Sequence, residues 1–119
     1  MSSGQGGYLT ATDASTVHVN FKKSRRWQVT LGGDRTLELA NAKDGEDYVL
    51  KITQDATGGR SVTWPSSVRW PGGSAPVLST AAAATDLIRL VAVGSVYYGL
   101  LCKRRLKTVA LGGRKTWRP

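Results

Sequence analysis

The sequence predicts an all-β fold, namely a small antiparallel β-sandwich or jelly-roll-like barrel with extended basic termini. The main observation is that about eight short runs alternate apolar and polar side chains, which is typical of half-buried strands. Gly-Gly and Trp-Pro pairs separate many of these runs, as turns between strands require. At most one short helical turn is expected in the chain. A chain of 119 residues fits one domain with one core.

Three strands are expected in the first part of the chain, over residues 17–21, 27–31 and 36–39. Each run places apolar side chains at every second position, so one face of each strand points into the core. The sequence Gly-Gly-Asp at 32–34 lies between the second and third runs, and glycine supplies the positive φ of a tight turn. We therefore expect 27–31 and 36–39 to pair as a hairpin.

The second part of the chain contains further strand patterns, at residues 48–54, 61–64, 68–70, 86–93 and 96–102. Gly94 and Ser95 join the last two runs, which predicts a hairpin with a type II′ turn. Because apolar residues occupy both parities of 86–93, this hairpin is expected to lie centrally in its sheet. One helical turn fits the four alanines at 81–84, and residues 108–111 fit an edge strand.

The composition divides the chain into a flexible N-terminal arm at 1–16, a β-sandwich domain at 17–102 and a basic C-terminal tail at 103–119. The single cysteine, Cys102, cannot form an intrachain disulfide. No segment reaches the roughly 18 apolar residues of a membrane span. We therefore expect a protein that is made and folded in a cytoplasm and has no membrane partner.

The net charge of +9 is concentrated in two clusters that hold 11 of the 17 basic residues. Six basic residues then face eight acidic ones, so the body of the domain is close to neutral. Basic appendages of this kind meet acidic protein surfaces, nucleic acid or anionic membranes. We expect an acidic protein partner, with apolar side chains such as Trp117 filling shallow pockets. The basic residues of the two clusters are Lys22, Lys23, Arg25, Arg26, Lys103, Arg104, Arg105, Lys107, Arg114, Lys115 and Arg118.

The sequence contains no recognisable catalytic constellation, so we expect no enzyme, no cofactor and no metal. His18 is the only histidine and is better explained as a surface or packed residue than as a catalyst. Cys102 ends an apolar strand, where a free cysteine usually behaves as a small buried hydrophobe. The carboxylates of Asp44, Glu46 and Asp47 lack the ligand spacing of a calcium loop, and a solvated turn explains them.

Five aromatic residues can line a surface that stacks on sugars or bases. In a small sandwich such residues more often belong to the core or to a subunit interface, and we prefer this interpretation. Two of them precede prolines at turns, which restricts their backbone. The residues are Trp27, Trp64, Trp70, Tyr97 and Tyr98.

Residues 54–73 contain the most distinctive motif, Gln-Asp-x-x-Gly-Gly-Arg-x-Val-x-Trp-Pro, followed by Val-Arg-Trp-Pro-Gly-Gly. Together with Leu-Ala-Asn-Ala at 39–42 and Tyr-Tyr at 97–98, this motif resembles a β-sandwich module of bacteriophage virion proteins. The module occurs in tail fibres, in baseplate or tail proteins and in head decorations. The resemblance covers about residues 30–98. The positions that it marks as scaffold are Gln54, Asp55, Gly58, Gly59, Trp64, Pro65, Trp70 and Pro71.

The resemblance implies a structural virion protein, commonly a homotrimer, without an enzymatic site. Fibre modules usually end a much longer chain, whereas here the module begins near the N-terminus and continues into a basic tail. For this reason we expect a capsid decoration (cement) protein on the outer surface of the head, bound to the major capsid protein or to neighbouring virion proteins. The alternatives are a tail fibre, baseplate or glycan-binding adhesin component, and a nucleic-acid-binding protein.

Overall fold

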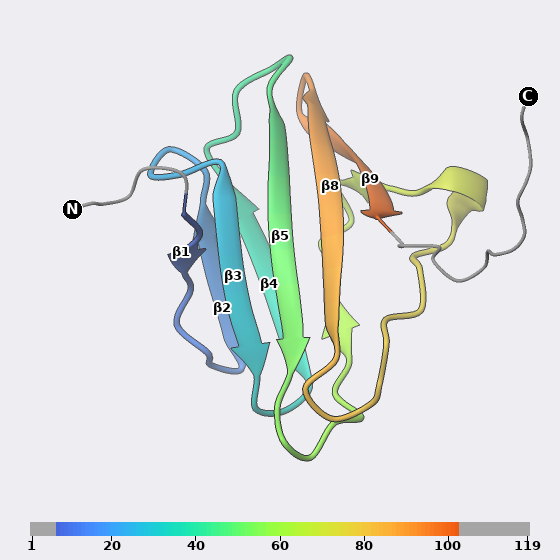
Figure 1. Cartoon of the computed structure of the whole chain (residues 1–119). Coiled ribbons are helices and arrows are strands. Elements are labelled where there is room, and N and C mark those ends of the chain that lie inside the picture. The colour runs from blue at the N-terminus through green and yellow to red at the C-terminus, as the bar shows by residue number, and fades with distance from the viewer. Residues whose placement is uncertain (1–6, 103–119) are drawn as a thin grey trace, which may run out of the picture.

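The computed structural model describes residues 7–102, which form nine strands and one 3-10 turn but no α-helix (Figure 1). No helix in this part of the chain is long and apolar enough to cross a membrane. The elements are β1 (Leu9–Thr10), β2 (Thr16–Asn20), β3 (Arg26–Leu31), β4 (Arg35–Ala40), β5 (Asp47–Gln54), β6 (Val62–Thr63), β7 (Val68–Arg69), η1 (Pro71–Gly73), β8 (Thr85–Val93) and β9 (Val96–Cys102).

The strands form two packed sheets, which confirms the all-β class. The large sheet has the order β1-β3-β5-β8-β9-β7, and the small sheet has the order β2-β4-β6. Figure 1 shows the small sheet packed against one face of the large sheet. The expectation of an antiparallel sandwich is wrong in its strand directions. Only β5–β8 and β8–β9 are antiparallel among the described pairs, and the other five pairs are parallel.

Four of the five parallel pairs arise because successive strands alternate between the sheets from β1 to β6, whereas the fifth joins β7 to β9 within the large sheet. Neighbours within a sheet are therefore two strands apart in sequence and run in the same direction. The hairpin expected from 27–31 and 36–39 does not form, since β3 lies in the large sheet and β4 in the small one. Leu31 and Leu37 are both buried between the sheets. Residues 32–34 thus form a corner between two layers, which lets both strands bury their apolar faces.

The hairpin of β8 and β9 is confirmed. Val93 pairs with Val96 in an antiparallel ladder, and Gly94 has a φ of 60°. Ser95 is not among the residues with positive φ, as a type II′ turn requires. The strand β8 lies centrally, between β5 and β9. In β5, Tyr48, Leu50 and Ile52 are buried on one face, as the alternation predicts.

Two segments differ from the sequence expectations. The strand β1 lies within residues 1–16, pairs with β3 and is followed by buried Ala11, so the folded domain begins before residue 17. Residues 81–84 form no helix, because Ala83 has a φ of 61° and donates its N–H to the Asp55 carbonyl. The edge strand expected at 108–111 lies outside the described residues.

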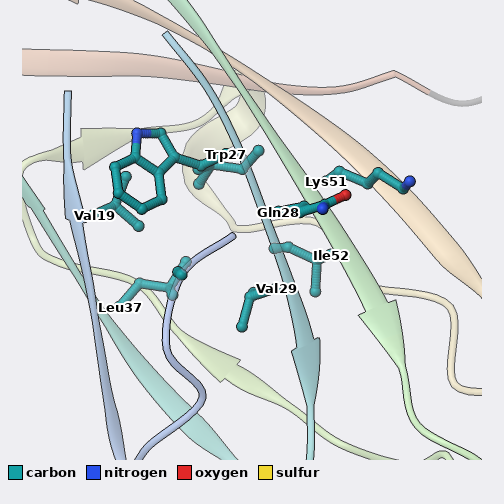
Figure 2. Close-up of a pocket in the computed structure, with 9 residues that line it drawn as sticks. Val19, Trp27, Gln28, Val29, Leu37, Lys51 and Ile52 are labelled. Atoms are coloured by element: carbon teal, nitrogen blue, oxygen red, sulfur yellow. The ribbon is translucent and has the colours of Figure 1, made fainter. Parts of the chain in front are cut away.

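The core lies between the two sheets and is closely packed. Phe21 and Tyr48 stack with their ring centroids 4.2 Å apart. Figure 2 shows Trp27 and Val29 reaching from β3 towards Val19 and Leu37 on the small sheet. The cavity that these residues line has a volume of about 10 Å³, which is at the lower limit for one water molecule. The core therefore leaves no room for a ligand, and interaction sites have to be sought on the surface.

Candidate interaction surfaces

The Gln54 side chain joins two loops at one end of the sandwich. It is buried, and its Nε2 donates hydrogen bonds of 2.9 Å to the carbonyl oxygens of Arg60 and Ser79. Its Oε1 accepts a 2.9 Å bond from the Arg60 N–H. One amide therefore satisfies three backbone groups that the fold withdraws from water. This geometry ties the turn after β5 to the segment before β8.

Asp55 organises the same turn through its carboxylate. Its Oδ1 accepts hydrogen bonds of 3.0 Å from the N–H groups of Thr57 and Gly58, and its Oδ2 lies 2.9 Å from Arg60 Nη2. The bond from Arg60, followed by that from the Gly58 N–H, lowers the pKa of Asp55 to about 2. The carboxylate is thus engaged within its own turn.

The backbone of Gly58 lies against the loop that contains Thr80. Its φ is 77°, and a Cβ built at this position would lie 2.5 Å from the Thr80 carbonyl oxygen. The next residue, Gly59, has a φ of 74° and open space around it, and its N–H donates to the same carbonyl. Glycine is therefore needed at Gly58 for two reasons and at Gly59 for one.

Next to this turn, Asp86 is a buried carboxylate for which the sequence analysis had no role. It accepts hydrogen bonds of 2.7 Å from the Ser79 N–H and 3.0 Å from the Ser79 hydroxyl. These bonds hold the segment before β8 against the sheet. The only sequence signal is an acidic residue inside an apolar strand, where a polar side chain is expected to have a partner.

The two Trp-Pro pairs lie together at the β7 edge of the large sheet, next to β9. The rings of Trp64 and Trp70 meet edge to face, with centroids 5.1 Å apart. Trp70 covers Gly99 of β9 so closely that a Cβ at Gly99 would lie 2.5 Å from its ring. Pro65 accepts a 3.1 Å bond from the Val68 N–H, and Pro71 begins η1. These residues therefore make contacts within the domain.

The aromatic stacking surface, which was the less favoured interpretation of the sequence, is not assembled. Trp27 and Tyr97 are buried, and Trp64 and Trp70 are half-buried against each other. Tyr98 alone of the five aromatic residues is exposed, at 53%. A flat platform of several rings for sugar or base stacking is therefore absent from residues 7–102.

Lys22, Lys23 and Arg25 lie in the loop between β2 and β3, and Arg26 is the first residue of β3. All four side chains are exposed. Arg25 is engaged by acids of the same domain, 2.8 Å from Glu46 and 3.8 Å from Asp47. In the part of the chain that the structure describes, Lys22, Lys23 and Arg26 form no ion pair within 4 Å. Three of the four cations thus retain their full capacity for an external acidic partner.

The residues weighed as possible catalysts or metal ligands are dispersed. His18 lies 2.9 Å from Glu38 on the exposed face of the small sheet. Asp44 accepts a bond from the Gly94 N–H, whereas Glu46 and Asp47 bind arginines. Among residues 7–102, no group of three potential ligands could hold a metal ion. The expectation that Cys102 is a buried hydrophobe is wrong, because its side chain lies on the exposed face of β9.

An exposed apolar strip, which the sequence analysis did not identify, crosses the outer face of the β8–β9 hairpin. It consists of the exposed residues Val93, Tyr98 and Leu100 and the half-buried Val91. Buried residues alternate with these positions in both strands, so the strip lies on the face opposite the core. The signal in the sequence was the apolar character of both parities of β8, which was interpreted only as a sign of a central strand.

Part of the predicted binding surface falls in the tail at 103–119, which lies outside the described residues. The residues concerned are Lys103, Arg104, Arg105, Lys107, Arg114, Lys115, Trp117 and Arg118.

Comparison with known proteins gives one match. Residues 9–97 match the sequence model of the family described as "Putative phage tail fibre C-terminal domain". No match was found among curated proteins or among solved structures. The matched range runs from β1 into β9 and contains the Gln54 turn, both Trp-Pro pairs and the loop at 22–26. The chain therefore belongs to this family of phage tail fibre C-terminal domains.

Proposed function

We propose that this protein is a structural module of the phage tail fibre. It is located on the tail of the virion and has neither a catalytic function nor a cofactor. The observation that carries this proposal is the family match over residues 9–97. The filled core and the engaged carboxylates agree with a structural role, since the described residues use their polar groups to hold loops together.

The tail is preferred to the capsid surface that we expected from the sequence. That expectation depended on the basic C-terminal segment and on the short N-terminal part of the chain. Neither feature distinguishes a protein of the phage head from a protein of the phage tail. The family description names the tail fibre. No observation favours a capsid decoration role in particular, so we do not retain it.

The partners that we propose are neighbouring virion proteins and further copies of the chain, arranged as a homotrimer. The exposed cations of the loop at 22–26 support contact with an acidic protein surface. The seven basic residues at 103–119, among which there is no acid, add to this contact.

Separation of the virion into heads and tails tests the location. Heads and tails are purified after osmotic disruption, and the chain is quantified in each fraction by mass spectrometry relative to a head marker and a tail marker. We expect the chain to co-purify with the tail marker. Recovery with heads, at a constant ratio to the major capsid protein, would reject the proposal and restore the decoration role.

A further inference from the structure

We propose that β2, the edge strand of the small sheet, pairs in antiparallel orientation with β2 of a second copy of the chain. The pairing joins the two small sheets into one continuous sheet across a twofold axis. It goes beyond the proposed function, because a twofold contact is additional to the contacts within the proposed homotrimer and does not depend on the location of the protein on the virion.

The strand β2 is the longest edge strand in the part of the chain that the structure describes. The two sheets end at β1, β7, β2 and β6. Three of these strands have 2 residues each, whereas β2 has 5. Very short edge strands, prolines and lysines keep sheets from pairing edge to edge. The sequence of β2, Thr-Val-His-Val-Asn, contains neither proline nor lysine, so this edge lacks such protection.

Alternate residues of β2 direct their backbone groups away from the domain. The Ser15 carbonyl accepts a 3.0 Å bond from the Thr36 N–H, and the register pairs Val17 with Leu37. Because partners alternate along a parallel strand, the odd-numbered residues of β2 bond to β4. The backbone groups of the even-numbered residues therefore point to the open edge of the sheet. These residues are Thr16, His18 and Asn20.

The same three residues line an open groove of about 490 Å³. Leu9, which is 40% exposed, lies in this groove as well. Within residues 7–102, the Asn20 carbonyl is already occupied, since it accepts a 3.0 Å bond from the Lys23 N–H. The N–H groups of all three residues and the C=O groups of Thr16 and His18 remain available. Addition of an extended strand to a sheet edge uses groups of this kind.

The arrangement of these groups favours a second copy of β2 as the partner. Thr16 and Asn20 lie two residues on either side of His18. In an antiparallel pair centred on His18, the two copies of His18 exchange N–H···O=C bonds, and each Asn20 N–H meets the Thr16 carbonyl of the other copy. Each imidazole keeps its own carboxylate, because His18 lies 2.9 Å from Glu38. The contact is also closed, because the joined sheet ends at the short strand β6 on both sides.

A disulfide between two copies tests the pairing directly. In purified Cys102→Ser protein, His18→Cys is compared with Glu38→Cys, which changes the exposed residue paired with His18 on β4. Residues of a hydrogen-bonded antiparallel pair have Cα atoms about 5.5 Å apart, which a disulfide spans. The two copies of position 38 are separated by three strand spacings, about 14 Å, which is too far.

We expect mild oxidation to convert most of the His18→Cys protein into a covalent dimer and little of the Glu38→Cys protein. Equal yields of dimer, or no dimer from His18→Cys, would overturn the inference. Because no other virion protein is present, a strand of a different protein cannot produce this dimer. Failure of the proposed function is a separate result, since the location of the chain on the virion does not enter this measurement.

The backbone hydrogen bonds have their own pair of variants. His18→Pro removes the outward N–H without removing a bond to β4, and proline is tolerated on an edge strand where its nitrogen faces away from the sheet. His18→Thr also removes the imidazole but keeps the N–H. Sedimentation of the full chain measures the mass of the particles, and circular dichroism verifies folding. We expect His18→Pro to halve the mass of the wild-type particle and His18→Thr to preserve it. The same mass for all three proteins, or a halved mass for both variants, would contradict the pairing.

Discussion

Gly58 and Gly59 are adjacent residues with almost equal φ angles, yet only Gly58 lies against another backbone. An alanine at either position adopts a left-handed conformation that costs roughly 1–2 kcal/mol. At Gly58 the added methyl group also meets the Thr80 carbonyl oxygen. The two positions therefore separate the effect of φ from the effect of close packing.

We predict that Gly58→Ala lowers the free energy of unfolding by about 3 kcal/mol and Gly59→Ala by about 1 kcal/mol. Urea unfolding followed by circular dichroism measures both values. Equal losses would mean that the Thr80 loop moves aside, in which case the contact between the two loops is not tight.

The lowered pKa of Asp55 makes the stability of the folded domain depend on pH. Its ordinary pKa is 3.8, and the hydrogen bonds from Arg60 and the Gly58 N–H lower the pKa to about 2 in the folded protein. The stability that the carboxylate contributes is therefore present above pH 3.8 and is lost as the pH falls towards 2. Wild type and Asp55→Asn should differ most in melting temperature at neutral pH and converge at pH 2. A difference that stays constant across this range would exclude the ion pair as its cause.

At the scale of elements, Trp70 and Gly99 hold the β7 edge against β9. The indole occupies the space that a side chain at Gly99 would need, so the two residues are coupled. Overpacking of this kind costs typically 1–3 kcal/mol.

A double-mutant cycle measures this coupling. We predict that Gly99→Ala lowers the free energy of unfolding by about 2 kcal/mol in the wild-type background and by under about 0.5 kcal/mol in the Trp70→Ala background. Urea unfolding of the four proteins provides the numbers. The same loss in both backgrounds would show that the strain at Gly99 does not come from the indole.

Elements whose structure depends on neighbours in sequence were predictable. The alternation in β5 and the Gly-Ser link of the β8–β9 hairpin act locally, and both predictions are confirmed. The pairing of β3 with β5 was not predictable, because β4, which lies between them in the sequence, belongs to the other sheet. The Gly-Gly-Asp sequence at 32–34 fits a hairpin and an inter-sheet corner equally well, and only burial of both Leu31 and Leu37 decides between them.

The exposed surface features were predictable only in part. Charge clusters are visible in the sequence, and the four basic side chains at 22–26 are exposed. The apolar strip was missed because apolar residues on the face of a strand opposite the core have two explanations. Either another layer of the same domain covers that face, or the face is exposed on the surface. Within residues 7–102 no such layer covers Tyr98 and Leu100, and exposure alone distinguishes the two cases.

For the whole molecule, the tail at 103–119 predicts salt-dependent attachment to the particle. Seven cations without an acid attract an acidic surface, and salt screens this attraction. We predict that a chain lacking these residues detaches from purified tails at lower salt than the full chain. Sedimentation of tails with added protein over a range of salt concentrations measures this effect. Identical salt profiles for both proteins would exclude a role of residues 103–119 in attachment.

The most direct test of the central claim, a tail location, is cryo-electron microscopy of the intact virion. The account predicts density for a two-sheet domain in the tail fibre, into which residues 7–102 fit as a rigid body. Density for this domain on the head, with none on the tail, would contradict the account.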